Sequence, residues 1–454
     1  MSQPDRKGRK LRVGFKPNRQ APRRAGDLTR RFRTDQEKLA DERQVESVRA
    51  KGELSRKRTI FVDQDGVPVV DESQWRRGTV LSVHGLVSRV EAEDATIWDC
   101  TARRVLRTLL IEQRSVVTCG DRVWFSDHAA YHDGQPVGVI ERVEPRTTVL
   151  SRRERRGHDR TRRLSEHAIV ANADQLLIVT SIAEPRCKPH LIDRYLVAAG
   201  KGHLRPVIVF NKWDLLGEEV RSQKSEVRSL NAGALSSEAG GSGETDPQLG
   251  TPKSELDVSA NRASDAELAV DFEDEDYAGP AITVADLVGE YRRIGYTCLL
   301  TSAISGLGLD ELRDVLRGRM TVLGGQSGVG KSSLLNALQP GLGLEVREVS
   351  PETEKGRHTT SLARLLKLDI GGWVVDTPGI RQFDLWNVEP GELEAYFTEF
   401  VPLVPQCRFR DCHHVQEESC AVIAAVERGQ ISYRRYCSYL KMLDELSEER
   451  RRSV

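Results

Sequence analysis

Apolar runs of three to seven residues recur from residue 174 onward and alternate with patterns typical of amphipathic helices. The runs have the length and continuity of buried parallel strands, and they cover residues 174–180, 205–210, 295–300, 320–323 and 373–375. The helical patterns cover residues 189–199, 307–317 and 333–338. Because strands that alternate with helices indicate a parallel sheet, this part of the chain predicts an α/β domain.

Upstream of residue 153 the pattern changes to shorter β-type runs joined by short turns. These runs cover residues 78–83, 95–98, 115–117, 121–125 and 137–140. Five short strands in succession favour a small barrel, and an OB-fold fits them best. The cluster of Arg103, Arg104 and Arg107 suits either RNA binding or an ordinary solvated face, and a barrel alone does not establish function.

Two segments lack such periodicity and carry opposite charges. Residues 1–33 contain twelve Lys or Arg against two Asp or Glu, whereas residues 216–286 contain sixteen acidic against five basic residues. Neither segment can bury enough apolar area to offset its ordering entropy, so we predict a largely disordered arm over 1–76 and a disordered insertion over 216–282. The arm is suited to lie along nucleic-acid phosphates or to act as a solubilising tail; the insertion is suited to act as a spacer or as a partner-mimicking arm.

The whole-chain composition narrows the class of protein. A length of 454 residues suggests about three domains, and the net charge of zero averages the two charged segments. The sequence has no stretch of about twenty apolar residues and no apolar core of a secretory signal, so a membrane-free, cytoplasmic protein is expected. Four of the eight cysteines crowd into residues 407–437, which favours a metal site over a disulfide framework.

One glycine-rich stretch between a predicted strand and a predicted helix fits G-x-x-x-x-G-K-[ST], the phosphate-binding loop. Its glycines let successive backbone N–H groups face a phosphate, and the helix N-terminus adds its positive dipole end. Lys331 can reach the β- and γ-phosphates, and the Ser332 hydroxyl can bind Mg²⁺. The candidate nucleotide-binding residues of the loop are Gly325, Gln326, Ser327, Gly328, Val329, Gly330, Lys331, Ser332 and Ser333.

Two further strand ends carry guanine-reading motifs. Asn211, Lys212 and Asp214 form Asn-Lys-x-Asp after the strand over 205–210. The Asp214 carboxylate can accept hydrogen bonds from guanine N1–H and the exocyclic amine, which adenine cannot donate, and this argues against an ATPase. The Lys212 stem can pack along the base, and Asn211 can brace the loops. Ser302 and Ala303, after the strand over 295–300, match the motif whose backbone N–H meets guanine O6.

The switch motifs follow the phosphate loop. Residues 356–360 include His358, Thr359 and Thr360, of which a threonine can close over Mg²⁺ and the γ-phosphate. Asp376 and Gly379 form Asp-x-x-Gly, with the carboxylate on a Mg²⁺-bound water and the Gly379 N–H on the γ-phosphate. Ser332, Thr360 and Asp376 are therefore the magnesium candidates. In an ordinary GTPase the guanine motifs come last; here they precede the loop, which indicates a circularly permuted GTPase whose second switch leads into a C-terminal domain.

That C-terminal domain contains Cys407, Cys412, His414 and Cys420. Three thiolates and one imidazole suffice for a structural zinc site with no open position. The spacing does not decide between His414 and His413. Helices are predicted over 421–428 and 432–449, and their Arg and Lys residues offer further phosphate contacts.

These motifs together resemble the RsgA (YjeQ) family of circularly permuted GTPases, which act in late assembly of the small ribosomal subunit. The resemblance also includes Asn172, Asp174 and Gln175. It implies an OB-fold barrel over 77–152, a permuted P-loop GTPase over 153–390 and a mostly helical zinc domain over 391–454. It further implies GTP/GDP, Mg²⁺ and one structural Zn²⁺ as cofactors, and a 30S subunit with its 16S rRNA as partner of a monomer.

The expected reaction is hydrolysis of GTP to GDP and phosphate, stimulated by the subunit. Lys331 and Mg²⁺ stabilise the charge on the phosphoryl oxygens. Ile380 stands where many GTPases carry a glutamine that orients the water, so His358 is the candidate for that role, with a solvent- or RNA-facing histidine as the alternative. The alternative function is an RNA-binding assembly factor switched by nucleotide occupancy, with hydrolysis incidental.

Overall fold

The computed structural model describes eleven stretches of the chain: residues 9–14, 57–62, 75–103, 106, 116–132, 134–153, 166–215, 269–270, 282–344, 363–376 and 388–453. They belong to two compact units. The first unit consists of residues 1–147, 153–172 and 362–365, and the second unit consists of residues 148–152, 173–361 and 366–454. Most of the arm and of the acidic insertion lies outside the described residues. Within them, β1 (Arg9–Gly14) pairs with β2 (Lys57–Val62), and β12 (Ala269–Val270) pairs with β13 (Ile282–Thr283), both antiparallel.

The first unit contains a five-stranded barrel. Its strands are β3 (Arg76–His84), β4 (Val87–Ala92), β5 (Ile97–Ala102), β6 (Arg122–His132) and β7 (Gln135–Val143). The order is β3-β4-β5-β7-β6, and β6 pairs back onto β3, while β5 and β7 run parallel. This is the expected OB-fold barrel, and alternate residues of its strands form a core that includes Val80, Val90, Trp98, Phe125 and Ile140.

Two details of the barrel differ from the sequence prediction. Val116 and Val117 lie in a bend, so the strand predicted over 115–117 is wrong. The bend is shaped by buried Asp121, which accepts from the Thr118 amide and pairs with Arg146. The pattern also missed β4, because its inward positions include Ser88 and Ala92, which carry little apolar signal.

The second unit is built on a parallel sheet in the order β14-β11-β10-β15-β17. The strands are β10 (Gln175–Ser181), β11 (Arg205–Asn211), β14 (Thr297–Leu300), β15 (Met320–Gly324) and β17 (Trp373–Asp376). All seven residues of β10 are buried, as expected for a strand covered on both faces. Of three further strands, β8 (Val149–Arg153) lies in this unit except for its last residue, and β9 (Glu166–Ala171) belongs to the first unit. The third, β16 (Arg364–Lys367), has two residues in each unit.

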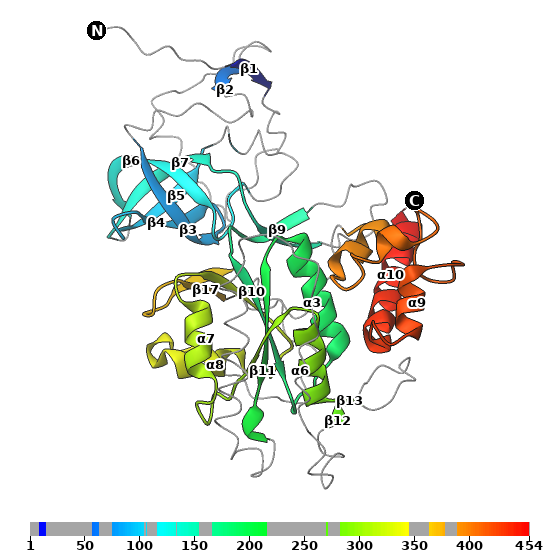
Figure 1. Ribbon diagram of the computed structural model, residues 1–454. Coiled ribbons are helices and arrows are strands. Elements are labelled where there is room, and N and C mark those ends of the chain that lie inside the picture. The colour runs from blue at the N-terminus through cyan, green and yellow to red at the C-terminus, as the bar shows by residue number, and fades with distance from the viewer. Residues whose placement is uncertain are drawn as a thin grey trace, which may run out of the picture. The chain divides into compact units, whose positions relative to one another are not determined.

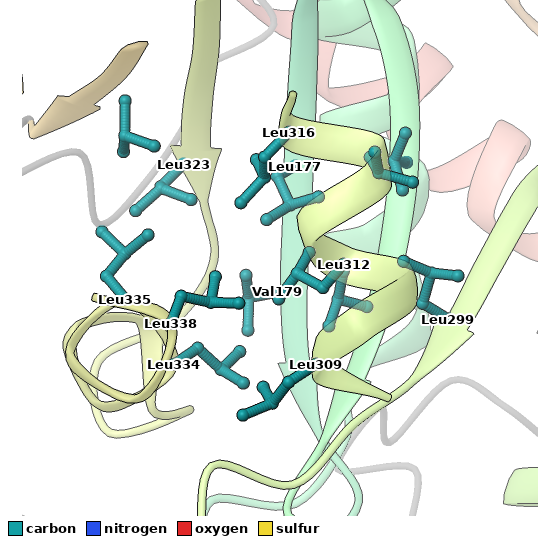
Figure 2. Close-up of a cluster of buried hydrophobic side chains, with 14 of the residues drawn as sticks. Leu177, Val179, Leu299, Leu309, Leu312, Leu316, Leu323, Leu334, Leu335 and Leu338 are labelled. Atoms are coloured by element: carbon teal, nitrogen blue, oxygen red, sulfur yellow. The ribbon is translucent and has the colours of Figure 1, made fainter. Parts of the chain in front are cut away.

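Helices cover both faces of this sheet (Figure 1). On one face, α7 (Leu309–Leu316) and α8 (Lys331–Leu338) pack their leucines onto alternate strand residues in one apolar cluster, shown in Figure 2. On the other face lie α3 (Pro189–Lys201) and α6 (Val284–Arg293). The sequence pattern missed α6, although Thr283 and Asp286 form a capping box at its start.

The C-terminal domain, described here over residues 388–453, follows β17. It contains the 3₁₀ helices η4 (Pro390–Tyr396) and η5 (Val404–Gln406) and the helices α9 (Ala421–Glu427) and α10 (Tyr433–Ser453), of which α9 and α10 were predicted. Its core is aromatic, with Phe397, Phe400 and Tyr439 in mutual ring contact. Among the described residues, no helix has both the length and the apolar content needed to cross a bilayer.

Candidate functional site

The phosphate-binding loop joins the end of β15 to the start of α8, as the sequence predicted. Gly325, Gly328 and Gly330 have φ angles of 137°, 82° and 89°, in the region that favours glycine. A Cβ atom on Gly325 would lie 2.1 Å from the Val179 carbonyl oxygen, and one on Gly330 would lie 2.4 Å from Asn211 Nδ2. The loop therefore depends on glycine both for its backbone path and for the space that it leaves to its neighbours.

Lys331, the first residue of α8, lies over this loop. Its Nζ donates to the carbonyl oxygens of Gly325 (2.8 Å) and Gln326 (2.7 Å). The helix that it begins rests on the sheet through Leu334, Leu335 and Leu338. The ammonium group and the N-terminal end of α8 therefore lie at the same short loop, the arrangement that suits an anion.

The two guanine motifs meet at neighbouring strand ends. Asp214 lies in η2 (Trp213–Leu215), directly after β11, and its Oδ1 accepts from Ser302 Oγ at 2.5 Å. The Trp213 amide donates to the Thr301 carbonyl at 3.1 Å. The Ser302 amide is used within its own loop, where it donates to the Leu307 carbonyl. Two segments that are almost ninety positions apart in the chain thus lie side by side at the carboxyl ends of β11 and β14.

Asn211 links these motifs to the phosphate loop. It is 1% exposed, its Nδ2 donates to the Val329 carbonyl at 2.8 Å, and its Oδ1 accepts from Thr301 Oγ1 at 3.3 Å. One amide side chain therefore spans three loops. The sequence suggested the bracing role of Asn211, but it gave no sign that the Thr301 hydroxyl completes it.

Lys212 has a contact that the sequence did not indicate. Its Nζ donates to the Glu184 carbonyl, in the loop between β10 and α3, and its backbone has a φ of 63°. Glu184 carries no recognisable motif, so only the fold could reveal that this loop borders the site.

Several predicted residues cannot be placed. His358, Thr359, Thr360 and Gly379 lie outside the described residues, and Asp376 is described only as the last backbone position of β17. Their roles, and that of Ser332 toward magnesium, stay predictions.

The four predicted metal ligands come together in the C-terminal domain. The ligand atoms of Cys407, Cys412, His414 and Cys420 all lie within 4.8 Å of one another. His414 Nδ1 is 3.3 Å from Cys420 Sγ and 3.7 Å from Cys407 Sγ. Burial raises the pKa of Cys412 to about 12, and the neighbouring thiols raise it as well. Three thiolates at this spacing therefore need a bound cation to offset their charge.

The structure decides between the two histidines. His414 is fully buried, with Nδ1 toward the cysteines and Nε2 2.6 Å from Glu394 Oε2, whereas His413 is exposed. A carboxylate behind the outer ring nitrogen is the usual support of a metal-binding imidazole. The donor set thus fits a four-coordinate metal such as zinc, held for a structural purpose.

The loop that carries His414 is shaped by a carboxylate. Glu417 accepts from the backbone amides of His413 (2.7 Å), Val415 (2.8 Å) and Gln416 (3.0 Å). Burial alone would raise the pKa of Glu417, but these amides hold it at about 2. The tight turn therefore presents His414 to the cysteines without help from a regular helix or strand.

Comparisons with known proteins agree with this geometry. A model of the RsgA GTPase family matches residues 143–246 and 258–386. The chain is 34% identical over 380 residues to the small ribosomal subunit biogenesis GTPase RsgA of Thermotoga petrophila, covering 83% of this chain and 99% of the relative. It is 36% identical over 372 residues to the protein of that name from Chlorobaculum parvum, covering 82% and 98%.

Solved structures are similar as well. The crystal structure of YjeQ from Thermotoga maritima matches with a TM-score of 0.53 and 32% identity, covering 82% of this chain and 98% of that one. The structure of YloQ, a circularly permuted GTPase, matches with a TM-score of 0.52 and 23% identity over 84% and 98%, which supports the fold alone. The phosphate loop and the guanine motifs lie at the carboxyl ends of neighbouring strands in permuted order, as the relatives lead one to expect. The family model and these relatives together show that the chain belongs to the RsgA GTPase family.

Proposed function

We propose that this protein hydrolyses GTP while it assists the assembly of the small ribosomal subunit. The observation that carries the GTP site is the position of Asn211, which holds the guanine motif, Thr301 and the phosphate loop together. Relatives of 34–36% identity over four fifths of the chain are named small ribosomal subunit biogenesis GTPases, which supports the subunit, with its rRNA, as the partner. A cytoplasmic monomer that binds 30S particles is consistent with this proposal.

In the proposed site, Asp214 reads the guanine edge and Ala303 offers the next backbone N–H after the occupied Ser302 amide. Lys331 binds the β- and γ-phosphates of the substrate. Mg²⁺ would be held by Ser332, Asp376 and a switch threonine, Thr359 or Thr360, and would add positive charge beside the phosphates. The Gly379 N–H completes the contacts to the γ-phosphate, and His358 orients the water.

The decisive experiment is GTP turnover with and without purified 30S subunits, with ATP as competitor. We expect slow intrinsic turnover that rises on addition of subunits and is unaffected by ATP. Equal turnover with and without subunits would contradict the partner, and competition by ATP would contradict the role of Asp214. If release of the protein from subunits follows nucleotide occupancy but not hydrolysis, the protein acts as an occupancy switch instead.

The water-orienting role of His358 has its own test. His358→Ala should lose most of the subunit-stimulated turnover while GTP affinity stays within a few-fold. Weakened GTP binding with unchanged turnover at saturation would instead give His358 a structural role.

A further inference from the structure

A group of charged side chains is buried where α10 of the C-terminal domain meets α3 and α6. Asp193 of α3 is fully buried, and Arg434 and Arg435 of α10 are 3% and 1% exposed. The sequence predicts further phosphate contacts for the arginines of α10, and for these two the prediction is wrong. Two adjacent arginines without access to solvent must be neutralised within the protein.

The hydrogen bonds of Asp193 satisfy both of its oxygens. Oδ2 accepts from Arg434 Nη1 at 2.8 Å, while Oδ1 accepts from Arg435 Nη1 at 2.7 Å and from Tyr291 Oη at 2.6 Å. Asp193 therefore connects one side chain of α6 and two of α10 to α3.

Each arginine has a second carboxylate of its own. Arg434 donates through Nε and Nη2 to Glu290 of α6, at 3.1 Å and 2.7 Å. Arg435 donates in the same way to Glu399, at 2.6 Å and 3.0 Å. Such forked pairs fix orientation as well as distance, so α10 is held in both position and rotation.

The charges of this group support one another. Burial by itself would raise the pKa of Asp193, but Arg434 and Arg435 outweigh it and hold that pKa at about 2. Burial would likewise lower the pKa of Arg434, whereas Asp193 and Glu290 raise it well above its usual range. Removal of one partner would leave a buried charge uncompensated, and this makes the group costly to open.

Apolar packing closes the same interface. Val197 of α3 belongs to the hydrophobic core of the C-terminal domain. A Cβ atom on Gly200 would lie 2.7 Å from the Tyr396 ring, so helix and ring are in direct contact there. Around this centre, the partly exposed pair Lys201–Glu392 (2.8 Å) forms part of the rim.

The metal cluster rests on the same helix. Tyr436 Oη donates to the His414 carbonyl at 2.7 Å, and Tyr439 Oη donates to the His413 carbonyl at 3.0 Å. These tyrosines follow Arg434 and Arg435 within about a turn of α10. The metal-binding loop is therefore fastened to the helix that enters the buried charge group.

We propose that Asp193 is a positioning residue: with Arg434 and Arg435 it keeps the C-terminal domain fixed on the α/β domain in every nucleotide state. Both domains then meet the ribosomal subunit as one rigid surface, a statement that rests on the function proposed above. The permuted order leads the second switch directly into the C-terminal domain, and this connection by itself would let the nucleotide state act on that domain. The buried charges and the shared core indicate that the domain stays in place.

The first test measures the distance between the domains and does not depend on the ribosome. Spin labels are placed at Asp310→Cys on α7 and Glu427→Cys on α9, both exposed, in a Cys437→Ser background. The remaining cysteines outside the metal cluster are buried. We expect one narrow distance distribution with the same mean for GDP and for a non-hydrolysable GTP analogue. A mean that shifts between the two nucleotides would overturn the proposal, whether or not any variant folds.

The second test uses Asp193→Asn, with Lys201→Ala as the matched control from the rim of the interface. Asp193→Asn should broaden the distance distribution and lower subunit-stimulated turnover about ten-fold, with intrinsic turnover unchanged. Lys201→Ala should leave all three quantities as they are, because exposed pairs contribute little. An unaltered distribution in Asp193→Asn would refute the positioning role. If wild-type turnover does not respond to subunits, the proposed function fails while the distance measurement still decides the inference.

Discussion

Replacement of Asn211 by alanine tests whether the three loops of the nucleotide site form one assembly. The substitution removes the donor to the Val329 carbonyl and the acceptor of the Thr301 hydroxyl, both of them buried contacts. A buried polar group left without its partner costs about 1–3 kcal/mol. If about 2 kcal/mol of this loss falls on the nucleotide-bound arrangement of the loops, the affinity for GDP drops about 30-fold.

The assay is titration with a fluorescent GDP analogue, alongside urea unfolding without nucleotide. Asn336→Ala is the matched control, since Asn336 also bridges backbone groups, donating to the Leu344 carbonyl and accepting from the Leu344 amide, but within α8 and the segment after it. We expect Asn336→Ala to lose stability without losing affinity. GDP affinity within three-fold of wild type in Asn211→Ala would refute the reasoning, because the loops would then hold their positions independently.

Three further outcomes follow from the structure. Gly330→Ala should abolish measurable GDP binding in the same titration, since its Cβ would lie 2.4 Å from Asn211 Nδ2 at a φ of 89°. Cys412→Ser should purify with substoichiometric zinc by elemental analysis and lose the cooperative unfolding of the C-terminal domain in circular dichroism. The pKa of Asp193 lies near 2, below its ordinary 3.8, so its contribution of about 2 kcal/mol is present above pH 4 and is lost as the pH falls toward 2. The difference in unfolding free energy between wild type and Asp193→Asn should therefore shrink over that range, and a constant difference would contradict it.

The parts of the site that the sequence could predict are those whose chemistry is local. The glycines of the phosphate loop must adopt positive φ angles wherever the rest of the chain goes, so the motif already contains its geometry. The same holds for the strand β10, whose continuous apolar run indicates burial on both faces. The spacing of the metal ligands also predicted the cluster, but it did not decide between His414 and His413.

The parts that could not be predicted depend on partners distant in the chain. The contact of Lys212 with the Glu184 carbonyl and the buried position of Arg434 arise only when separate segments fold together. The charge of an arginine does not reveal its partner. An arginine that binds phosphate and an arginine that pairs with a buried aspartate look alike in the sequence. The helix α6 was missed for a different, local reason: it follows the acidic insertion, and that composition masks its capping box.

The permuted order requires a chain connection between the guanine motifs and the phosphate-loop strand that an unpermuted GTPase lacks. Hydrogen bonds hold this joint in place. Residues 317–319 connect α7 to β15, at the end of the sheet away from the nucleotide loops. Asp174 makes two hydrogen bonds to Met320, the residue directly after the joint. Its amide donates to the Met320 carbonyl at 2.8 Å, and its carboxylate accepts from the Met320 amide at 2.6 Å. The Trp373 amide donates to the Arg319 carbonyl at 2.9 Å from the opposite side.

Gln175 secures both elements that the joint connects. It is fully buried, and its Nε2 donates to the Val315 carbonyl in α7 at 3.0 Å and to Thr321 Oγ1 in β15 at 2.8 Å, while Arg319 donates to its Oε1. The sheet therefore keeps β15 in register next to β10 although the chain enters β15 from α7, the helix that follows the guanine motifs. Because all the site loops leave the opposite, carboxyl ends of these strands, the order in which the chain visits them has no effect on the edge that they form. That is why motifs in permuted order still predict one nucleotide site.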